Sequence, residues 1–139
     1  MRTMRRTYVD SCVLIAAYQG TQEISSAAMA VLDDPDRQFV VSSYVELEVL
    51  PKPLFYNRAE EVAFMRQFFG EASERIETSQ EIICDAVALA AKYDLSPIDA
   101  LHASIARTAS VDELVTLEGC NKPLLRVSEP NVVTLREPS

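Results

Sequence analysis

Residues 7–18 read Thr-Tyr-Val-Asp-Ser-Cys-Val-Leu-Ile-Ala-Ala-Tyr, which is a short strand followed directly by a helix. The strand ends on an acid, Asp10, and the apolar helix over residues 11–18 stops near Gly20. This order places Asp10 at the carboxyl end of a strand, where open α/β sheets bind their ligands. A solvated turn aspartate is the alternative interpretation, but apolar residues flank Asp10 on both sides.

The same alternation of short strands and helices continues along the chain. The patterns predict helices over residues 22–32, 58–72, 81–93 and 97–107, with a capping box from Thr78 to Glu81. Strands are expected at residues 38–42, around Ile76 and at 112–116, and one or two more in the tail, around 124–127 and 132–135. Pro51 and Pro53 are expected to close the segment 43–50. Because no hairpin turn of the Asn-Gly type is present, the pattern predicts an α/β fold with a mainly parallel sheet.

Length and composition are typical of an ordinary globular protein. With 139 residues, 48% apolar and 24% charged, residues 1–139 are expected to form a single domain. We expect no membrane association and a cytoplasmic location, because neither a membrane-spanning run nor a secretory signal is visible. The cysteines at positions 12, 84 and 120 are odd in number and lack metal-ligand spacing, which argues against a disulfide or zinc framework.

Several classes of function are excluded by what the chain lacks. It has one histidine, three glycines and no glycine-rich phosphate loop, so neither a nucleotide-cradling loop nor a serine hydrolase is expected. No organic cofactor is predicted. The net charge of −8 argues against general coating of nucleic acid. A nuclease remains compatible with it, because cations bound to a carboxylate cluster reverse the local sign of the field.

Residues 93–107 place a further acid at the start of a helix. Ser96 can cap this helix, Pro97 suits its first position, and Asp99 falls in the first turn. A bland interpretation is that Asp99 only completes a Ser-x-x-Asp capping pattern. His102 follows Asp99 by three residues and so lies on nearly the same face, where a packing or supporting role is favoured over that of a catalytic base.

Together the acids define a candidate metal site. Asp10, Glu46 or Glu48, Asp99 and Glu118 all lie near predicted strand or helix ends. Glu46 and Glu48 point about 200° apart on a helix, so only one can face the site. Carboxylates without histidine or cysteine companions suit Mg²⁺ or Mn²⁺, and such a cluster is retained only when cations or protons neutralise it. The chemistry predicted for it is metal-assisted phosphodiester hydrolysis.

Four motifs, in order, resemble those of the PIN domain family, which includes VapC-type ribonuclease toxins. They are Val-Asp-Ser-x-Val-Leu-Ile (9–15), Ser-x₄-Leu-Glu-Val-Leu-Pro-Lys (42–52), Leu-Ser-Pro-Ile-Asp-Ala-Leu-His (95–102) and Val-Thr-x-Glu (115–118), and the resemblance covers residues 7 to 127. It implies a three-layer α/β/α fold whose mainly parallel central sheet has four or five short strands. It also implies a Mg²⁺- or Mn²⁺-dependent endoribonuclease acting on single-stranded or structured RNA.

The resemblance also assigns roles to individual residues. Asp10, Glu48, Asp99 and Glu118 would be both catalytic residues and metal ligands, and Ser11 and Thr116 would support them. Glu48 matches the family glutamate better than Glu46 because it lies six residues after Ser42. Two departures are visible: Glu118 stands where an aspartate is usual, and Cys12 stands where asparagine or serine is frequent.

The resemblance further implies partners, and two competing functions remain open. A toxin of a type II toxin–antitoxin pair would form homodimers and bind a small antitoxin, with the apolar faces of helices 58–72 and 11–18 as candidate contact surfaces. The first alternative is a catalytically weak or inactive PIN-like binding module. The second is a receiver-like signalling domain, which ranks lower because Asp10 lacks an adjacent acidic partner.

Overall fold

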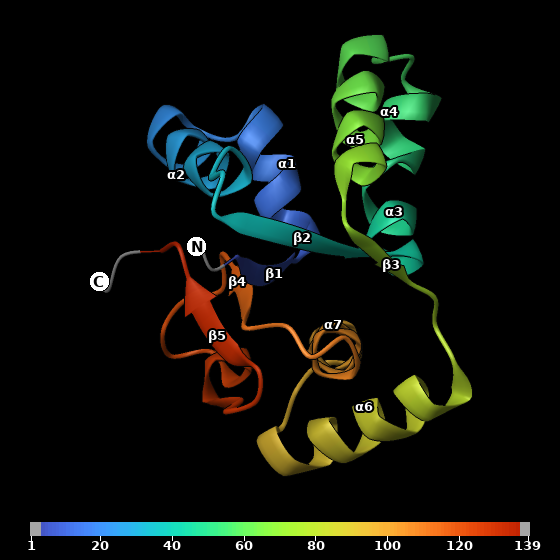
Figure 1. Cartoon of the computed structure of the whole chain (residues 1–139), viewed down its shortest axis with the longest axis vertical. Coiled ribbons are helices and arrows are strands. Elements are labelled where there is room, and N and C mark those ends of the chain that lie inside the picture. Colours follow the sequence, from blue (N-terminus) through green and yellow to red (C-terminus); the bar gives the residue numbers. More distant parts are fainter. Residues whose placement is uncertain (1–3, 137–139) are drawn as a thin grey trace.

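The computed structural model describes residues 4–136, which form a five-stranded sheet with helices on both sides (Figure 1). The strands are β1 (Arg5–Val9), β2 (Arg37–Ser42), β3 (Glu74–Ile76), β4 (Glu113–Thr116) and β5 (Asn131–Thr134). The helices are α1 (Ser11–Gln19), α2 (Gln22–Leu32), α3 (Ser43–Val49), α4 (Pro51–Phe55), α5 (Ala59–Glu71), α6 (Gln80–Tyr93), α7 (Pro97–Thr108) and the 3₁₀ helix η1 (Pro123–Arg126).

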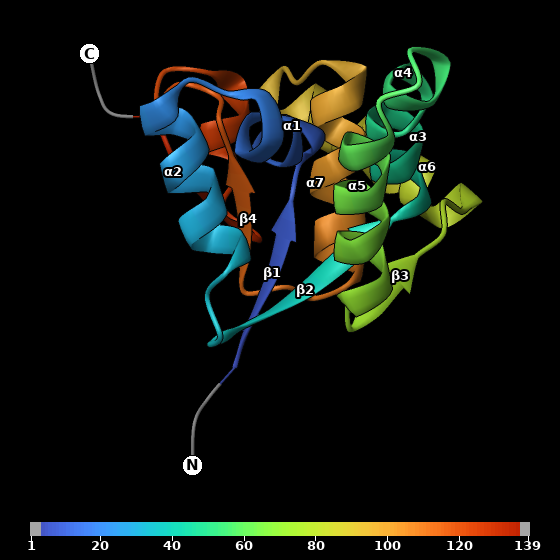
Figure 2. The ribbon, with the colours of Figure 1, turned by 90° about the horizontal axis from the view of Figure 1, so that it is seen from above.

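All strand pairs are parallel, and the strand order is β3-β2-β1-β4-β5. Helices α1, α2 and α5 cover one face of the sheet, and α6 and α7 cover the other, as the two perpendicular views show (Figures 1 and 2). The predicted α/β/α fold with a mainly parallel sheet is therefore confirmed. After β1 the chain moves to one side to form β2 and returns to the other side for β4, so a topological switch point lies between β1 and β4.

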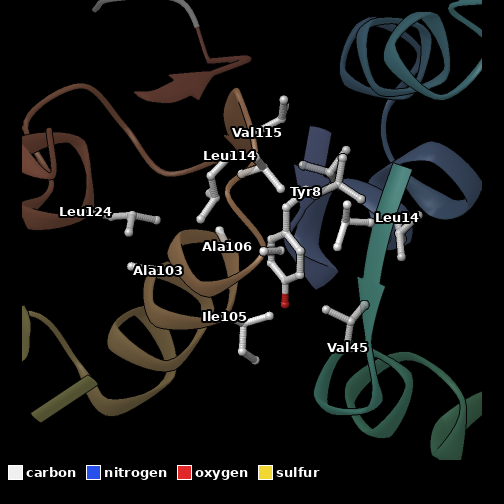
Figure 3. Close-up of a cluster of buried hydrophobic side chains, with 14 of the residues drawn as sticks. Tyr8, Leu14, Val45, Ala103, Ile105, Ala106, Leu114, Val115 and Leu124 are labelled. Atoms are coloured by element: carbon white, nitrogen blue, oxygen red, sulfur yellow. The ribbon is translucent and has the colours of Figure 1, made fainter. Parts of the chain in front are cut away.

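The core lies between the central strands and the helices that cover them (Figure 3). The last three residues of β1 are fully or almost fully buried; they are Thr7, Tyr8 and Val9. A strand buried on both faces is typical of the centre of a parallel sheet. Figure 3 shows the ring of Tyr8 among side chains of β4, α7 and α3, so β1 joins both layers of the core.

Three local predictions were wrong. Helix α3 does end directly before Pro51, as predicted, but Pro53 closes nothing: it lies within the next helix, α4, whose first residue is Pro51, a position where the missing N–H has no cost. Ser79, and not Thr78, caps α6, because its hydroxyl accepts the N–H of Ile82 at 3.2 Å. Residues 124–127 do not form a strand: they fall in and just after η1, where Leu124 is fully buried.

The apolar faces proposed as contact surfaces are largely used within the fold. Val13 and Leu14 of α1 and Met65 of α5 are fully buried in the core. Most of the large exposed apolar side chains lie on α3, on or just after α4, and on α6, with one more on each of α1 and α7; they are Leu47, Leu54, Phe55, Tyr56, Ile83, Val87, Tyr18 and Ile98. Within residues 4–136, the helices are too short or too polar for any of them to cross a membrane.

Candidate metal centre

The carboxyl ends of β1 and β4 bring the first and last predicted site residues together. Asp10 follows β1 directly and its backbone N–H donates to the carbonyl of Val115 in β4 at 3.2 Å. Thr116 is the last residue of β4, and Glu118 follows two residues later. Both strand ends border the topological switch point, which is the usual ligand position in open parallel sheets.

The side chain of Asp10 is held by two elements, α1 and β4. It caps α1, where its Oδ1 accepts the N–H of Val13 at 3.3 Å, and its Oδ2 accepts the hydroxyl of Thr116 at 2.6 Å. Asp10 is only 4% exposed, and burial raises its pKa although the Thr116 hydrogen bond opposes the change. The nearby negative charge of Asp99 adds to the increase. Asp10 is thus a fixed carboxylate whose ionised form is electrostatically unfavourable without a counter-charge.

The two glutamates of α3 point to different neighbours. Glu48 accepts a hydrogen bond from the ring of His102, with 2.8 Å between Oε1 and Nε2. Glu46 instead pairs with Arg75 at 2.5 Å, on the exposed side of the helix. Since His102 belongs to α7, the helix that also carries Asp99, the structure turns Glu48 toward the other acids and Glu46 away from them.

Asp99 lies in the first turn of α7, as the cap and proline predicted. The hydroxyl of Ser96 accepts the backbone N–H of Asp99 at 3.2 Å, and Pro97 is the first helical residue. Burial raises the pKa of Asp99, the Ser96 hydrogen bond lowers it, and the charge of Glu48 raises it again. The capping interpretation is therefore correct, but it does not account for the proximity of Asp99 to Glu48 and Asp10.

The negative charges of the four acids all act on the thiol of Cys12. Burial raises the pKa of its thiol to about 11, and the charges of all four carboxylates contribute to this increase, those of Asp10, Glu118, Glu48 and Asp99. Electrostatic interactions of this kind fall off with distance, so the four carboxylates lie on the same side of the molecule as Cys12.

The two predicted supporting residues occupy different positions. Thr116 joins two of the acids, because its hydroxyl donates to Asp10 and accepts the backbone N–H of Glu118 at 3.1 Å. Ser11 is buried as the first residue of α1, directly after Asp10. Thr116 therefore fixes the geometry between β1 and β4, while Ser11 contributes to the packing of the same edge.

The types of donor atom at this edge suit a hard divalent cation. The acidic side chains are too far apart, however, for several of them to bind one ion as they stand. Within residues 4–136, no three acidic, histidine or cysteine side chains are close enough together to form a ready-made metal site. The donor atoms available are carboxylate oxygens, which are the ligands that Mg²⁺ and Mn²⁺ prefer. The four groups surround one edge of the sheet, and Glu48 and Glu118 are only partly buried.

Sequence reasoning missed a buried hydrogen-bond network behind the acids. The hydroxyl of Tyr8 lies 2.9 Å from the hydroxyl of Ser42 and 2.8 Å from Nδ1 of His102. Burial raises the pKa of Tyr8 far above its usual value, so its proton stays in place at neutral pH. One signal was present in the sequence: Tyr8 and Asp10 are two residues apart at a strand end, and so are expected on the same side.

Comparison with known proteins agrees with this architecture. The profile of the PIN domain family matches residues 7–118. A solved toxin–antitoxin complex from Klebsiella pneumoniae is similar at 25% identity and a TM-score of 0.68, over 94% of this chain and 98% of that one. VapBC2 from Rickettsia felis, solved with a DNA fragment from its promoter, shares the fold at 14% identity, a TM-score of 0.68, and 94% and 99% coverage. No curated protein matches the chain. Since the family profile spans most of its length, the chain belongs to the PIN domain family of nucleases.

Proposed function

We propose that this chain is a Mg²⁺- or Mn²⁺-dependent endoribonuclease and the toxin of a type II toxin–antitoxin pair. The observation that carries the proposal is that Asp10, Glu48, Asp99 and Glu118 lie at the carboxyl edge of the sheet, each near enough for its charge to act on the thiol of Cys12. These residues come from β1, α3, α7 and the segment after β4, so only the folded chain assembles them. RNA is the proposed substrate, and residues 1–139 are proposed to form one domain.

The chemistry of this donor set supports phosphodiester hydrolysis. A bound divalent cation supplies Lewis-acid chemistry, by activating water and stabilising negative charge on a phosphate. The protein contributes rigid ligand positions: Thr116 holds Asp10, the cap of α7 holds Asp99, and His102 holds Glu48. The proposal requires no side-chain nucleophile.

The proposed partners follow from the similarity to a toxin–antitoxin complex over nearly the full length of both chains. An antitoxin that covers the acidic edge would suppress activity, and a homodimer is proposed for the toxin itself. The exposed apolar residues of α4 and α6, such as Phe55 at 77% and Val87 at 66% exposure, are available for such contacts. A cytoplasmic location is part of the same proposal.

A second function has its own supporting observation. Because the acids do not form a ready-made metal site, a PIN-like module that binds RNA or protein without cleavage is the competing proposal. Two substitutions relative to the family pattern, Cys12 and Glu118, lie at the same edge of the sheet. Metal binding separates this module from the enzyme.

The first experiment is cleavage of a labelled single-stranded RNA with Mn²⁺ or Mg²⁺. Wild type is compared with Asp99→Asn, with an EDTA control, and with Asp33→Asn, a matched change of an exposed aspartate at the end of α2. We expect cleavage by wild type and Asp33→Asn only. Equal cleavage by Asp99→Asn would remove Asp99 from the mechanism, and no cleavage together with no metal binding would favour the binding module.

A further inference from the structure

His102, the single histidine of the chain, is fixed on all sides behind the acidic edge. Its side chain is 3% exposed, and both ring nitrogens have partners at 2.8 Å, Nδ1 with the hydroxyl of Tyr8 and Nε2 with Oε1 of Glu48. The rings of Tyr8 and Tyr44 pack against it, with centroids 5.7 Å and 5.3 Å away. The imidazole therefore has little freedom to rotate.

The chemistry of its partners fixes the direction of the hydrogen bond to Glu48. An ionised carboxylate only accepts hydrogen bonds, so Nε2 of His102 must carry a proton and donate it. This holds whether the ring is neutral or charged, because Nδ1 can either accept from Tyr8 or donate to it while Tyr8 donates to Ser42. In both cases His102 is a donor to Glu48.

The network ties Glu48 to three elements. Ser42 ends β2 and caps α3, accepting the N–H of Val45 at 3.1 Å, and Tyr8 joins Ser42 to His102. The path therefore runs from the start of α3, through β1 and α7, back to Glu48 in the second turn of α3. A glutamate has three side-chain torsions to restrict, and this path restricts them before any ligand arrives.

We propose that His102 is a positioning residue, which takes up Oε1 of Glu48 and so presents Oε2 to the divalent cation. This inference rests on the proposed metal-dependent function. Its ring is buried and both nitrogens are already hydrogen-bonded, so the role proposed for His102 is positioning and not catalysis. Ligating carboxylates are commonly oriented by such hydrogen bonds, whose loss typically weakens metal binding about 10- to 100-fold.

The first test measures Mn²⁺ affinity by calorimetry for wild type, His102→Gln and His102→Asn. The glutamine amide reaches far enough to replace Nε2 and donate to Glu48, whereas the shorter asparagine replaces only the side toward Tyr8. We expect near wild-type affinity for His102→Gln and about 10- to 100-fold weaker binding for His102→Asn. Equal affinities in the two variants, each confirmed as folded by circular dichroism, would overturn the proposal.

The second test needs neither metal nor a variant of His102. Nitrogen-15 NMR of the single histidine in wild type is expected to show an Nε2–H that exchanges slowly with water, and this signal should change in Glu48→Ala. A ring that exchanges freely in wild type, or that is unaffected by Glu48→Ala, would contradict the hydrogen bond. This measurement remains decisive if His102→Asn does not fold.

A failure of this inference can be told apart from a failure of the proposed function. If wild type binds Mn²⁺, Asp99→Asn does not, and His102→Asn binds like wild type, then the metal site stands and the positioning role is wrong. If wild type itself binds no Mn²⁺ or Mg²⁺, the proposed function fails and the positioning role fails with it.

Discussion

Thr116→Val tests the hydrogen bond that holds Asp10 in the candidate site. The substitution keeps the shape of a fully buried side chain and removes the hydroxyl that donates to Asp10 at 2.6 Å. A hydrogen bond to a charged group contributes about 1.5–3 kcal/mol, so the free energy of unfolding should fall by about that amount. The backbone N–H of Glu118 loses its acceptor as well, which makes the upper half of this range the better expectation.

Thr7→Val, in the middle of the neighbouring strand β1, provides a matched control away from the acidic edge. Thr7 is also fully buried, and its hydroxyl donates to the buried carboxylate of Glu113 at 2.7 Å. Glu113 keeps a second donor, Arg37 at 2.8 Å, so the loss of stability should be similar or somewhat smaller. The two variants therefore differ chiefly in their distance from the acidic edge.

The difference should appear when urea unfolding is measured with chelator and then with Mn²⁺. At a concentration about 100 times the wild-type dissociation constant, Mn²⁺ should stabilise wild type and Thr7→Val by about 2.7 kcal/mol. If Thr116→Val binds about 10- to 100-fold more weakly, its gain falls to about 1.4–0.4 kcal/mol. Equal stabilisation of all three proteins would refute the assignment of Asp10, held by Thr116, to the metal site.

Three further predictions concern the acids themselves. Glu48→Gln should abolish Mn²⁺-dependent cleavage, whereas Glu46→Gln on the same helix should retain it and change the free energy of unfolding by no more than about 1 kcal/mol, because its pair with Arg75 is solvent-exposed; comparable activity in the two variants would contradict the assignment of Glu48. Burial raises the pKa of Asp10 and Asp99 above the ordinary 3.8, so the native state holds protons more tightly than the unfolded state, and stability from these groups is present at low pH and lost as pH rises through the raised values. In chelator, urea unfolding of Asp10→Asn/Asp99→Asn should therefore show less loss of stability with rising pH than wild type, and identical slopes would show that neither pKa is raised. EDTA should lower the melting temperature of wild type, followed by calorimetry, and leave that of Asp99→Asn unchanged.

Much of the fold could be predicted because short local sequence patterns determine most of its helices and strands. The helix over residues 22–32 has the bounds predicted for it, and the absence of hairpin turns correctly indicated parallel strands. The errors occur where a residue type is equally suited to two different positions in a helix. Proline suits both the residue after a helix and the first turn of the next one, so Pro51 and Pro53 indicated the end of α3 but not the start of α4. Thr78 and Ser79 are both capping residues, and only the backbone conformation decides between them.

The candidate site was partly predictable for a different reason. Acids at the ends of strands and helices can be recognised from the sequence alone. Their roles remain a prediction until metal binding is measured. What the sequence could not supply is the pairing between distant residues. Glu48 and His102 are separated by 54 positions, and Tyr8 and His102 by 94, so neither hydrogen bond has a local signal. Such pairs depend on strand order, because β1 must lie between β2 and β4 before Tyr8 can reach both α3 and α7.

The site combines unfavourable charges with donors that hold each charge in place. Two of the acids accept a specific hydrogen bond, Asp10 from Thr116 and Glu48 from His102, and Asp99 is held through its backbone N–H, which donates to the hydroxyl of Ser96. These bonds come from residues outside the acidic set, and they fix the positions of the carboxylates. Burial still raises the pKa of Asp10 and Asp99. Because burial and neighbouring carboxylates still disfavour the ionised forms, a bound cation should stabilise the folded protein, and metal-dependent stabilisation is therefore the most direct measure of the proposed function.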